Sequence, residues 1–575
     1  MEFLKVVFSS IYVLLDKCNV VVINSNSTLK SIYLMFKLNR LLILSALFLV
    51  LTVLFSCSST DDGNLLVFRY NESKGISSLD PAFARSQSLI WPVHQLFDGL
   101  VQFDEQLNIV PAIAKSWIIS DDGLLYTFYL RTDVLFHPHV LFKSKAERIV
   151  TAHDFVYSFN RVVHPSTASP GAWIFSKLDK DFGQGGVFAV NDSVLQLRLS
   201  AAFPPFLGML GMKYSAVVPR RVVEHAPNEF GANPIGTGPF LMKIWRQGEI
   251  LILHANPEYY QLDSSGSSLP YIDAVSVTFI NDKQSEFMEF MLGKVDFISG
   301  INSQFKDALL TRSGNLRKEN AEQMYLQKAQ YLNTEYLGFN LDSTQGDVVP
   351  LAVRKAINYC FNREEMVMYM RNNMADAALK GMVPPSLSKP YGQELVGYQY
   401  DKNRARKILS DAGFKNGYPN SIDLYTTSDY VDLCEYIQHN AKQIGININI
   451  HLATGASFRN LVANGKAQMF RGSWIADYPD AENYLSLFYS GNKSPNGPNY
   501  TRFYHAKFDS IYIQSLTAGD SEKYLLYLQM EQLIISNAPV VPLFYDNVVR
   551  FVNQRVADFP VNPLNLLEIK CLRLD

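Results

Sequence analysis

The sequence lacks an excess of charge of either sign. Its 52 Lys and Arg residues stand against 54 Asp and Glu residues, so the formal net charge is −2. Proteins that bind nucleic acid through its phosphates need a basic field, and this composition does not provide one. We therefore expect no nucleic-acid partner.

An aromatic content of 13% suits a protein that encloses a small ligand, although it equally suits an aromatic-rich β core.

Cysteine is also scarce, and the few cysteines are not spaced as ligands. The chain has five, and those after Cys57 are Cys360, Cys434 and Cys571. An odd number without a Cys-x-x-Cys spacing indicates neither a disulfide framework nor a zinc site. His137-Pro-His139 and His153-Asp154 have no Glu or Cys nearby to complete a zinc spacing. We expect no metal and no cofactor.

Catalytic motifs are missing as well. The sequence contains no Gly-x-Ser-x-Gly elbow and no His-Glu-x-x-His helix. Gly236-Thr-Gly-Pro239 lacks the Gly-Lys-Ser/Thr ending of a phosphate-binding loop, and we interpret its glycines as supplying backbone conformations that other residues avoid. We therefore expect no catalytic residue and do not expect an enzyme.

The N-terminal region is typical of an export signal. Residues 41–56 are almost entirely apolar and follow Lys37 and Arg40, as in a signal peptide. At 16 residues the run is short for a membrane-spanning helix, which needs ~20. Leu54-Phe-Ser-Cys57 resembles the lipobox of bacterial lipoproteins, which implies cleavage before Cys57 and a lipid anchor on it. We interpret residues 1–34 as an over-long start, with Met35 as the natural one.

The 519 residues from Cys57 to Asp575 suffice for roughly three domains. Their pattern mixes strands with helices. Residues 124–131 alternate as a half-buried strand, with Leu124, Tyr126, Phe128 and Leu130 on one face. Residues 351–361 predict a helix, and residues 401–413 predict another that Asp401 caps and Gly413 ends. Strands at 422–425 and 446–450 around a helix near 431–444 predict an α/β unit.

The segment Arg471–Tyr484 is the candidate binding wall. Residues 467–470 predict a short apolar strand, and a turn at Pro479 follows, so that Asp477 lies at a strand end between Trp474 and Tyr478. A carboxylate there is partly desolvated and needs a cation from the protein or from a ligand. The alternative is that Asp477 caps a helix or turn that begins at Pro479.

The run from Trp474 to Asp480, Trp-Ile-Ala-Asp-Tyr-Pro-Asp, resembles a segment of the oligopeptide- and dipeptide-binding proteins of bacterial ABC importers, the family 5 extracytoplasmic solute-binding proteins. Blocks at 114–155, 233–240, 293–297 and 539–545 resemble the same family in the same order. The resemblance implies an α/β fold with two lobes, the class II periplasmic-binding-protein fold, and an extra domain inserted in the first lobe.

We place the domain boundaries accordingly. Residues 1–56 form the N-terminal extension and signal peptide, and residues 57–64 the anchor and tether. The first lobe takes 65–100, 215–330 and 535–575, the inserted domain 101–214, and the second lobe 331–534. The two lobes are expected to close about a hinge whose chain crossings lie at 329–333 and 535–541.

The resemblance also implies the site. Asp477 matches the aspartate that binds the peptide's α-ammonium group, with Trp474 and Tyr478 beside it. Arg471 matches a basic residue near the peptide's carboxylate end. Arg502 is a second candidate for the carboxylate on position alone, and a solvated loop arginine is the alternative for it.

The implied function is the binding of short peptides and their delivery to the permease subunits of an ABC importer. The protein is then expected to be a monomer, held at the periplasmic or extracellular face of a membrane through Cys57. Other solutes bound on this scaffold, namely nickel complexes, opines, sugars and murein peptides, remain alternatives. So do a signalling receptor and an envelope hydrolase.

Overall fold

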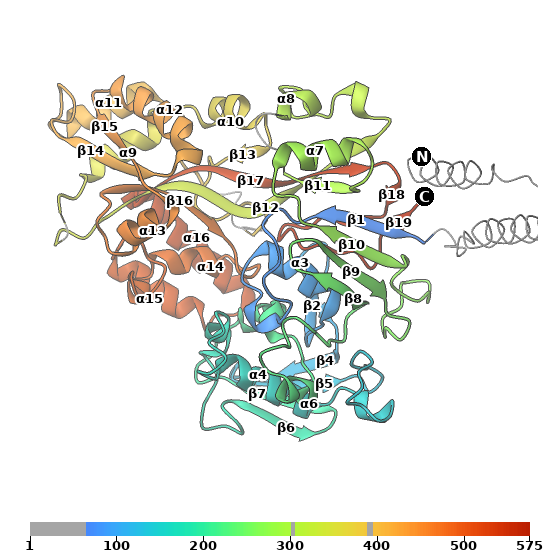
Figure 1. Ribbon diagram of the computed structural model, residues 1–575. Coiled ribbons are helices and arrows are strands. Elements are labelled where there is room, and N and C mark those ends of the chain that lie inside the picture. The colour runs from blue at the N-terminus through green and yellow to red at the C-terminus, as the bar shows by residue number, and fades with distance from the viewer. Residues whose placement is uncertain (1–64, 301–304, 345, 388–394) are drawn as a thin grey trace, which may run out of the picture. The chain divides into compact units, whose positions relative to one another are not determined.

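One mixed β-sheet runs through both lobes of the protein. The computed structural model describes residues 65–300, 305–344, 346–387 and 395–575, and Leu66–Asp575 form one compact unit. Ten strands follow one another across the sheet (Figure 1): β15 (Asn447–Leu452), β14 (Ser421–Thr426), β16 (Met469–Ile475), β12 (Met324–Phe339), β17 (Val540–Asn553), β11 (Phe297–Ser299), β1 (Val67–Asn71), β10 (Ala274–Thr278), β9 (Ile250–Ala255) and β8 (Phe240–Arg246). An eleventh strand, β13 (Ala375–Ala377), pairs with β17.

The first lobe is built around β1, β8–β11 and the helix α3 (Gln87–Leu96). Strand β1 is parallel to β10 and β11, whereas β10, β9 and β8 are antiparallel neighbours. Alternation places Phe68 and Tyr70 of β1 in the core, as expected for a strand with one buried face. The short helices α7 (Lys283–Met291) and α8 (Lys306–Leu309) contribute to a smaller core beside it.

The second lobe is an α/β unit, as predicted. Strand β14 is parallel to β15 and β16, and the predicted helices form around them. The helices of this lobe are α9 (Leu351–Tyr359), α10 (Arg363–Arg371), α11 (Lys402–Asp411), α12 (Val431–Lys442), α13 (Gly455–Ala463), α14 (Glu482–Leu485), α15 (Ala506–Ser515) and α16 (Asp520–Asn537). Asp401 caps α11 by accepting a hydrogen bond from the Arg404 amide at 2.8 Å, and Gly413 follows with φ +91°. The helix signals at 401–413 are therefore confirmed.

Two long strands connect the lobes, and the second crossing lies later than the sequence predicted. Strands β12 and β17 are antiparallel and run through both lobes (Figure 1). Their register breaks between Gln330, opposite Asn547, and Thr334, opposite Tyr545. Residues 538–544 pack in the second-lobe core, so the crossing of β17 is near 545–547 and not at 535–541. An apolar run in the sequence does not show whether its residues pack in the core of the first lobe or in that of the second.

A third core surrounds a four-stranded sheet in the order β4 (Ala114–Ile119), β5 (Leu125–Leu130), β7 (Val194–Arg198) and β6 (Val187–Asn191). Tyr126, Phe128 and Leu130 of β5 are buried, as the alternation predicted. The helix α4 (Ala152–Val163) packs in the same core, and Tyr478 of the second lobe joins it. The boundaries 101–214 of the inserted domain stay a prediction.

The glycines of the turn 236–239 have a different role from the one expected. Neither Gly236 nor Gly238 has a positive φ, so the expectation of an unusual backbone conformation is wrong. A Cβ on Gly236 would lie 1.9 Å from the Leu96 carbonyl oxygen, and one on Gly238 would lie 2.5 Å from the Gln95 carbonyl oxygen. Close approach to the end of α3 is what excludes larger residues here.

His137 holds the same turn. Its Nδ1 accepts a hydrogen bond from the Gly236 amide at 3.2 Å, and its Nε2 lies 3.1 Å from the Gly238 carbonyl oxygen. The ring is buried, which lowers its pKa to about 4. A neutral imidazole with both nitrogens engaged therefore has a structural role in this turn.

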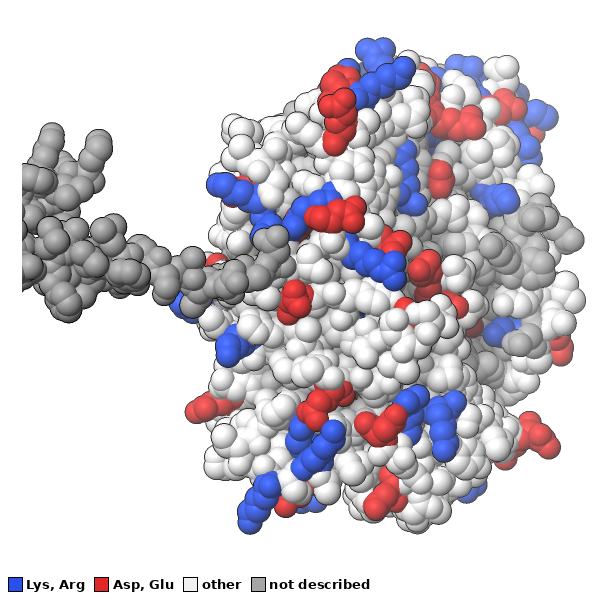
Figure 2. All heavy atoms as spheres, turned by 90° about the vertical axis from the view of Figure 1, so that its right-hand side faces the viewer, with Lys and Arg blue, Asp and Glu red and all other residues white. Residues whose placement is uncertain are grey.

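The lipobox Leu54-Phe-Ser-Cys57 and the rest of residues 1–64 lie outside the described residues. In the described part of the chain, no helix is both long and apolar enough to cross a membrane. On the face that Figure 2 shows, Lys and Arg side chains lie among Asp and Glu side chains. Neighbouring charges of opposite sign therefore compensate one another on that face.

Candidate binding cleft

The strand β16 continues through the candidate binding segment and divides its side chains between two faces of the sheet. It ends at Ile475, not at the predicted Phe470. Ser473 pairs with Glu335 and Ile475 pairs with Asn333 of β12, and directly paired residues share a face. Arg471, Ser473 and Ile475 therefore lie on one face, which we call the cleft face, whereas Trp474 packs toward the second-lobe core.

Asp477 follows this strand by two residues and has no cation beside it among the described residues. Its amide donates to Asn483 Oδ1 at 3.2 Å, and the indole of Trp474 donates to the same oxygen at 2.8 Å. The carboxylate is exposed, yet surrounding protein desolvates it enough to raise its pKa to about 6, against a smaller lowering by Asn483. An ionised carboxylate here remains available for an external cation.

The structure contradicts the alternative that Asp477 caps a helix. The helix α14 begins at Glu482, and Asp480 Oδ1 accepts from the Glu482 amide at 2.9 Å. Asp480 also accepts a hydrogen bond from the Tyr527 hydroxyl at 2.8 Å. The local turn-forming role therefore belongs to Asp480.

Tyr478 joins the second lobe to the inserted domain. It is buried in the core of that domain, and its ring lies 6.5 Å from that of Trp173. Its hydroxyl donates to Glu482 Oε2 at 2.5 Å. Burial raises the pKa of Glu482 to about 7, which the hydrogen bonds from Tyr478 and Tyr512 only partly oppose. Tyr478 is thus an interdomain contact as well as a neighbour of Asp477.

Tyr214 of the inserted-domain core lies close enough to Asp477 for the charge of that carboxylate to affect its pKa, and no local sequence pattern predicted this. Its ring fills the space above Gly171, where a Cβ would lie 2.2 Å from the ring carbon Cγ. Burial raises the pKa of Tyr214 to about 12, with a further contribution from the charge of Asp477. The inserted domain therefore faces the candidate ammonium site.

Arg471 lies on the cleft face in a network of charged and polar groups. Its guanidinium pairs with Glu335 and stacks on the ring of Tyr430, 3.3 Å from the ring centroid. Glu335 also accepts from Asn333 Nδ2 at 3.1 Å, and the same nitrogen donates to Asp546 Oδ2 at 3.1 Å. Arg471 Nε has no hydrogen-bond partner among the described residues.

Arg502 does not lie in this network. Its side chain is in the interior of the second lobe, where the guanidinium donates to the carbonyl oxygens of Tyr500, Ala463 and Val462 at 2.9, 2.7 and 3.4 Å. Burial lowers its pKa. The alternative of a solvated loop arginine is therefore wrong, and this placement also gives no support to a role in binding a carboxylate.

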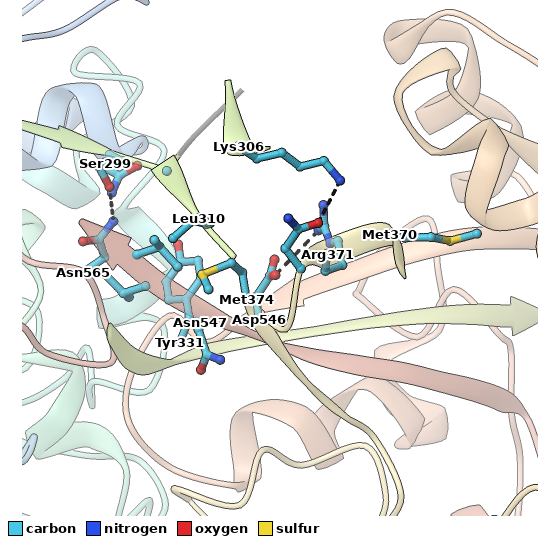
Figure 3. A pocket seen from close by; sticks show the side chains of 15 residues that line it. Ser299, Lys306, Leu310, Tyr331, Met370, Arg371, Met374, Asp546, Asn547 and Asn565 are labelled. Carbon is cyan, nitrogen blue, oxygen red and sulfur yellow. Dashed lines mark hydrogen bonds and ion pairs between the residues drawn. The ribbon is translucent and has the colours of Figure 1, made fainter. Parts of the chain in front are cut away.

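A cavity of about 390 Å³ opens beside the two crossing strands. Figure 3 shows Arg371 of α10 beside Asp546 of β17 in this cavity, with Lys306 of α8 above them. Ser299 and Asn565 of the first lobe line the opposite side, and Gln87 also lines the cavity. Because both lobes supply its walls, the cavity is a part of the interlobe cleft.

Arg371 and Asp546 were not among the residues that the sequence singled out. Arg371 is the last residue of an amphipathic helix, a position where arginine commonly serves the helix dipole. Asp546 is the one carboxylate of a mostly apolar strand, Val540–Asn553. That interruption was the one available signal, because burying an Asp in a strand requires a partner.

The polar groups of the cleft are suited to binding a small charged ligand. Within the described ranges, no group of three or more His, Cys, Asp and Glu side chains is placed to hold a metal ion. The described cysteines Cys360, Cys434 and Cys571 are free, and burial raises the pKa of each. The cleft instead presents carboxylates, guanidinium groups and amides, which bind ammonium groups, carboxylates and backbone amides.

Known proteins share this fold along most of the chain. The dipeptide-binding protein of Escherichia coli is 24% identical over 488 residues, covering 82% of this chain and 87% of that protein. Heme-binding protein A of Haemophilus influenzae is 25% identical over 487 residues, covering 82% and 85%. The structure of DppA from Helicobacter pylori, a periplasmic binding protein associated with an ABC transporter and solved with the peptide STSA, matches with a TM-score of 0.70 and 25% identity, covering 88% of this chain and 98% of that one.

The family model described as bacterial extracellular solute-binding proteins, family 5, middle part, matches residues 108–496, which is more than half of the chain. The matched span includes the inserted sheet, the strand β12 and the segment that holds Asp477. It begins and ends inside the described fold, so the likeness rests on the lobes and not on the N-terminal signal. The protein therefore belongs to the bacterial extracellular solute-binding proteins of family 5.

Proposed function

We propose that the protein binds short peptides with a free N-terminus and delivers them to an ABC importer. One observation supports this most directly: Asp477 is an exposed carboxylate at the end of β16 with a raised pKa and no cation among the described residues. A carboxylate in such a place is a suitable partner for an α-ammonium group. Relatives named for dipeptide and glutathione binding support the same ligand class.

The peptide backbone is the feature that a sequence-tolerant site recognises. An extended peptide offers amides, an ammonium and a carboxylate whatever its side chains are. Asp477 binds the ammonium in this proposal, with Trp474 and Tyr478 fixing its position. Arg471 remains the candidate for the carboxylate, because it lies on the cleft face, where its guanidinium also pairs with Glu335.

The proposed location of the protein rests on the N-terminal signal. We infer cleavage before Cys57 and acylation of that cysteine, which anchors a monomeric binding protein to the membrane beside the permease subunits of the importer. A Cys57→Ser protein is then expected to lose membrane association and the mass of the lipid. Retention in the membrane with an intact N-terminus would identify residues 41–56 as a spanning helix instead.

The competing ligand classes are distinguished by charge. A neutral sugar carries no cation that Asp477 could bind. A murein peptide still has a free N-terminus and therefore belongs to the proposed class. We propose no enzymatic activity.

Native mass spectrometry of the purified protein tests the proposal. We expect bound masses that correspond to a series of short peptides and that disappear from the Asp477→Asn protein. The matched control is Asp480→Asn, which changes a nearby carboxylate that already accepts hydrogen bonds from the protein. A single non-peptide mass that survives Asp477→Asn would refute peptide binding.

A further inference from the structure

The side chain of Asn483 bonds to two residues of the binding segment at once. Asn483 is the second residue of α14 and is 3% exposed. Its Oδ1 accepts hydrogen bonds from the Trp474 indole at 2.8 Å and from the Asp477 amide at 3.2 Å. Because an amide nitrogen does not accept such bonds, the two N–H donors fix the orientation of the Asn483 side-chain amide.

The bond to the Asp477 amide lies where the segment leaves the sheet. The Ala476 amide still donates to the Leu332 carbonyl oxygen of β12 at 2.8 Å. One residue later, the Asp477 amide donates to Asn483 instead. The backbone from which the Asp477 carboxylate extends is therefore held by Asn483.

Asn483 also acts on the carboxylate itself. A hydrogen bond from its side chain lowers the pKa of Asp477, although burial has the larger and opposite effect. A hydrogen bond lowers the pKa of a carboxyl group when it stabilises the ionised form. The donor in this side chain is Nδ2, so Asn483 serves the backbone of Asp477 with Oδ1 and its carboxylate with Nδ2.

The nearby carboxylate of Glu482 is held in a different way. It is buried and accepts hydrogen bonds from the hydroxyl groups of Tyr478 and Tyr512. Those bonds enclose Glu482 within the protein, whereas Asp477 remains exposed beside the amide of Asn483. Asn483 can therefore orient Asp477 and leave it open to a ligand.

The helix α14 gives Asn483 a fixed base. Tyr484 and Leu485, which follow it, are fully buried in the second-lobe core. The Asn483 amide donates to the Asp480 carbonyl oxygen at 3.1 Å, and the Asn483 carbonyl oxygen accepts from Ser486 Oγ at 3.0 Å. Moving Asn483 would require the displacement of core residues.

We propose that Asn483 is a positioning residue of the ammonium site, which orients Trp474 and the Asp477 backbone through Oδ1 and donates to the Asp477 carboxylate through Nδ2. It acts on the ligand through Asp477. This role rests on the proposed function, because the ammonium group that Asp477 binds is that of a peptide.

Two signals of the unliganded protein test the contacts without any ligand. In Asn483→Ser, the shorter side chain does not span both partners. We expect the NMR titration midpoint of the Asp477 carboxyl group to rise by about one pH unit, because a hydrogen bond to the ionised form is lost. The Trp474 indole N–H should exchange with solvent at least about tenfold faster. Asp477→Asn and Trp474→Phe identify the two signals by their loss.

A second variant separates the two roles and keeps the buried acceptor. Asn483→Asp retains an oxygen for both N–H donors and loses the Nδ2 donor. The exchange rate of the Trp474 indole should then stay within about twofold of that of the wild type. The midpoint of Asp477 should still rise, because a second carboxylate beside it disfavours its ionisation.

Calorimetry with one tripeptide, free and N-acetylated, connects these contacts to binding. At pH 7 we expect Asn483→Ser to reduce the preference for the free peptide at least about tenfold, since Asp477 is less ionised and less well oriented. Its affinity for the acetylated peptide should change by less than about twofold, which also shows that the cleft is folded. The pH at which binding of the free peptide weakens should rise together with the Asp477 midpoint.

Asn440→Ser is the matched control. Asn440 is a buried asparagine of α12 in the same lobe, and its Nδ2 donates to the Tyr436 carbonyl oxygen at 2.8 Å. The substitution should leave the Asp477 midpoint and the preference for the free peptide unchanged. Equal changes in Asn440→Ser and Asn483→Ser would overturn the assignment, because they would reflect general loosening of the lobe.

The outcomes separate this role from the proposed function. If the wild type prefers the free peptide and Asn483→Ser keeps both that preference and the Asp477 midpoint, the positioning role is refuted and peptide binding stands. If the wild type binds the free and acetylated peptides equally, the ammonium site itself is refuted, and the positioning role fails with it.

Discussion

Asp477 and Glu335 are carboxylates of the same lobe with opposite circumstances. Glu335 is buried, pairs with Arg471 and accepts a hydrogen bond from Asn333. Asp477 is exposed, with its pKa raised to about 6 and no cation among the described residues. The comparison teaches that two carboxylates of one lobe can differ in whether the protein itself supplies their cation. Mutations at the two sites should therefore affect different measurements.

The largest expected effect on folding is at Glu335. The change Glu335→Gln leaves the Arg471 guanidinium without its counter-ion in a mostly buried position. Breaking a buried pair in this way should lower the free energy of unfolding by about 3 kcal/mol, measured by urea denaturation. Asp477→Asn is the control and should change it by less than about 1 kcal/mol. Equal losses at both positions would remove the distinction between the two carboxylates.

Arg502 should behave like Glu335 and not like Asp477. Replacing it by Leu removes the donor for three backbone carbonyl oxygens in the interior. We expect a loss of about 2 kcal/mol in unfolding free energy, because buried carbonyls then lack a partner. Peptide affinity, measured by calorimetry at a temperature where the variant is folded, should be unchanged. A selective loss of affinity would restore Arg502 to the binding site.

A pH titration of peptide binding sharpens the comparison further. Only the ionised form of Asp477 pairs with an ammonium, and its pKa is about 6 in the free protein. The peptide's α-ammonium stays protonated below pH 7, so lowering the pH from 7 to 5 should weaken binding about tenfold, or ~1.4 kcal/mol. The Asp477→Asn protein should lose this dependence. If the dependence persists there, the titrating group is another one, such as Glu482, whose pKa is about 7.

The smallest expected effect is on shape. The register break between β12 and β17 at 330–334 is the place where the lobes can rotate. Small-angle scattering should give a slightly smaller radius of gyration with saturating peptide than without it. Superimposable curves would argue against closure upon binding.

Much of the fold followed from the sequence because its signals are local. As predicted, the helix of residues 402–411 begins after Asp401 and ends before Gly413. The alternating residues Tyr126, Phe128 and Leu130 are buried in a core, also as predicted. The crossing of β17 could not be located, because apolar residues of a long strand enter two cores without a change of pattern. The glycines of residues 236–239 were misinterpreted because close approach to another segment leaves no local mark.

The candidate site was only partly predictable, because contacts between distant segments leave no local pattern in the sequence. Asp477 is next to Trp474 and Tyr478 in sequence, so its environment was foreseeable. Arg371, Tyr214 and Asp546 come from three separate segments and meet the cleft only in the fold. Arg502 was considered on position alone, and nothing local indicated that carbonyl oxygens of residues 462–463 would bind it.

The central claim is that Asp477 binds the α-ammonium group, and a double comparison by calorimetry tests it most directly. Wild-type protein and Asp477→Asn are each titrated with one tripeptide, free and N-acetylated. Removing either partner of this ion pair should cost the wild type about 2–5 kcal/mol of binding free energy, because the other charge stays desolvated alone. Acetylation should then cost the Asn variant little more. Equal affinity of the wild type for the free and the acetylated peptide would contradict the account.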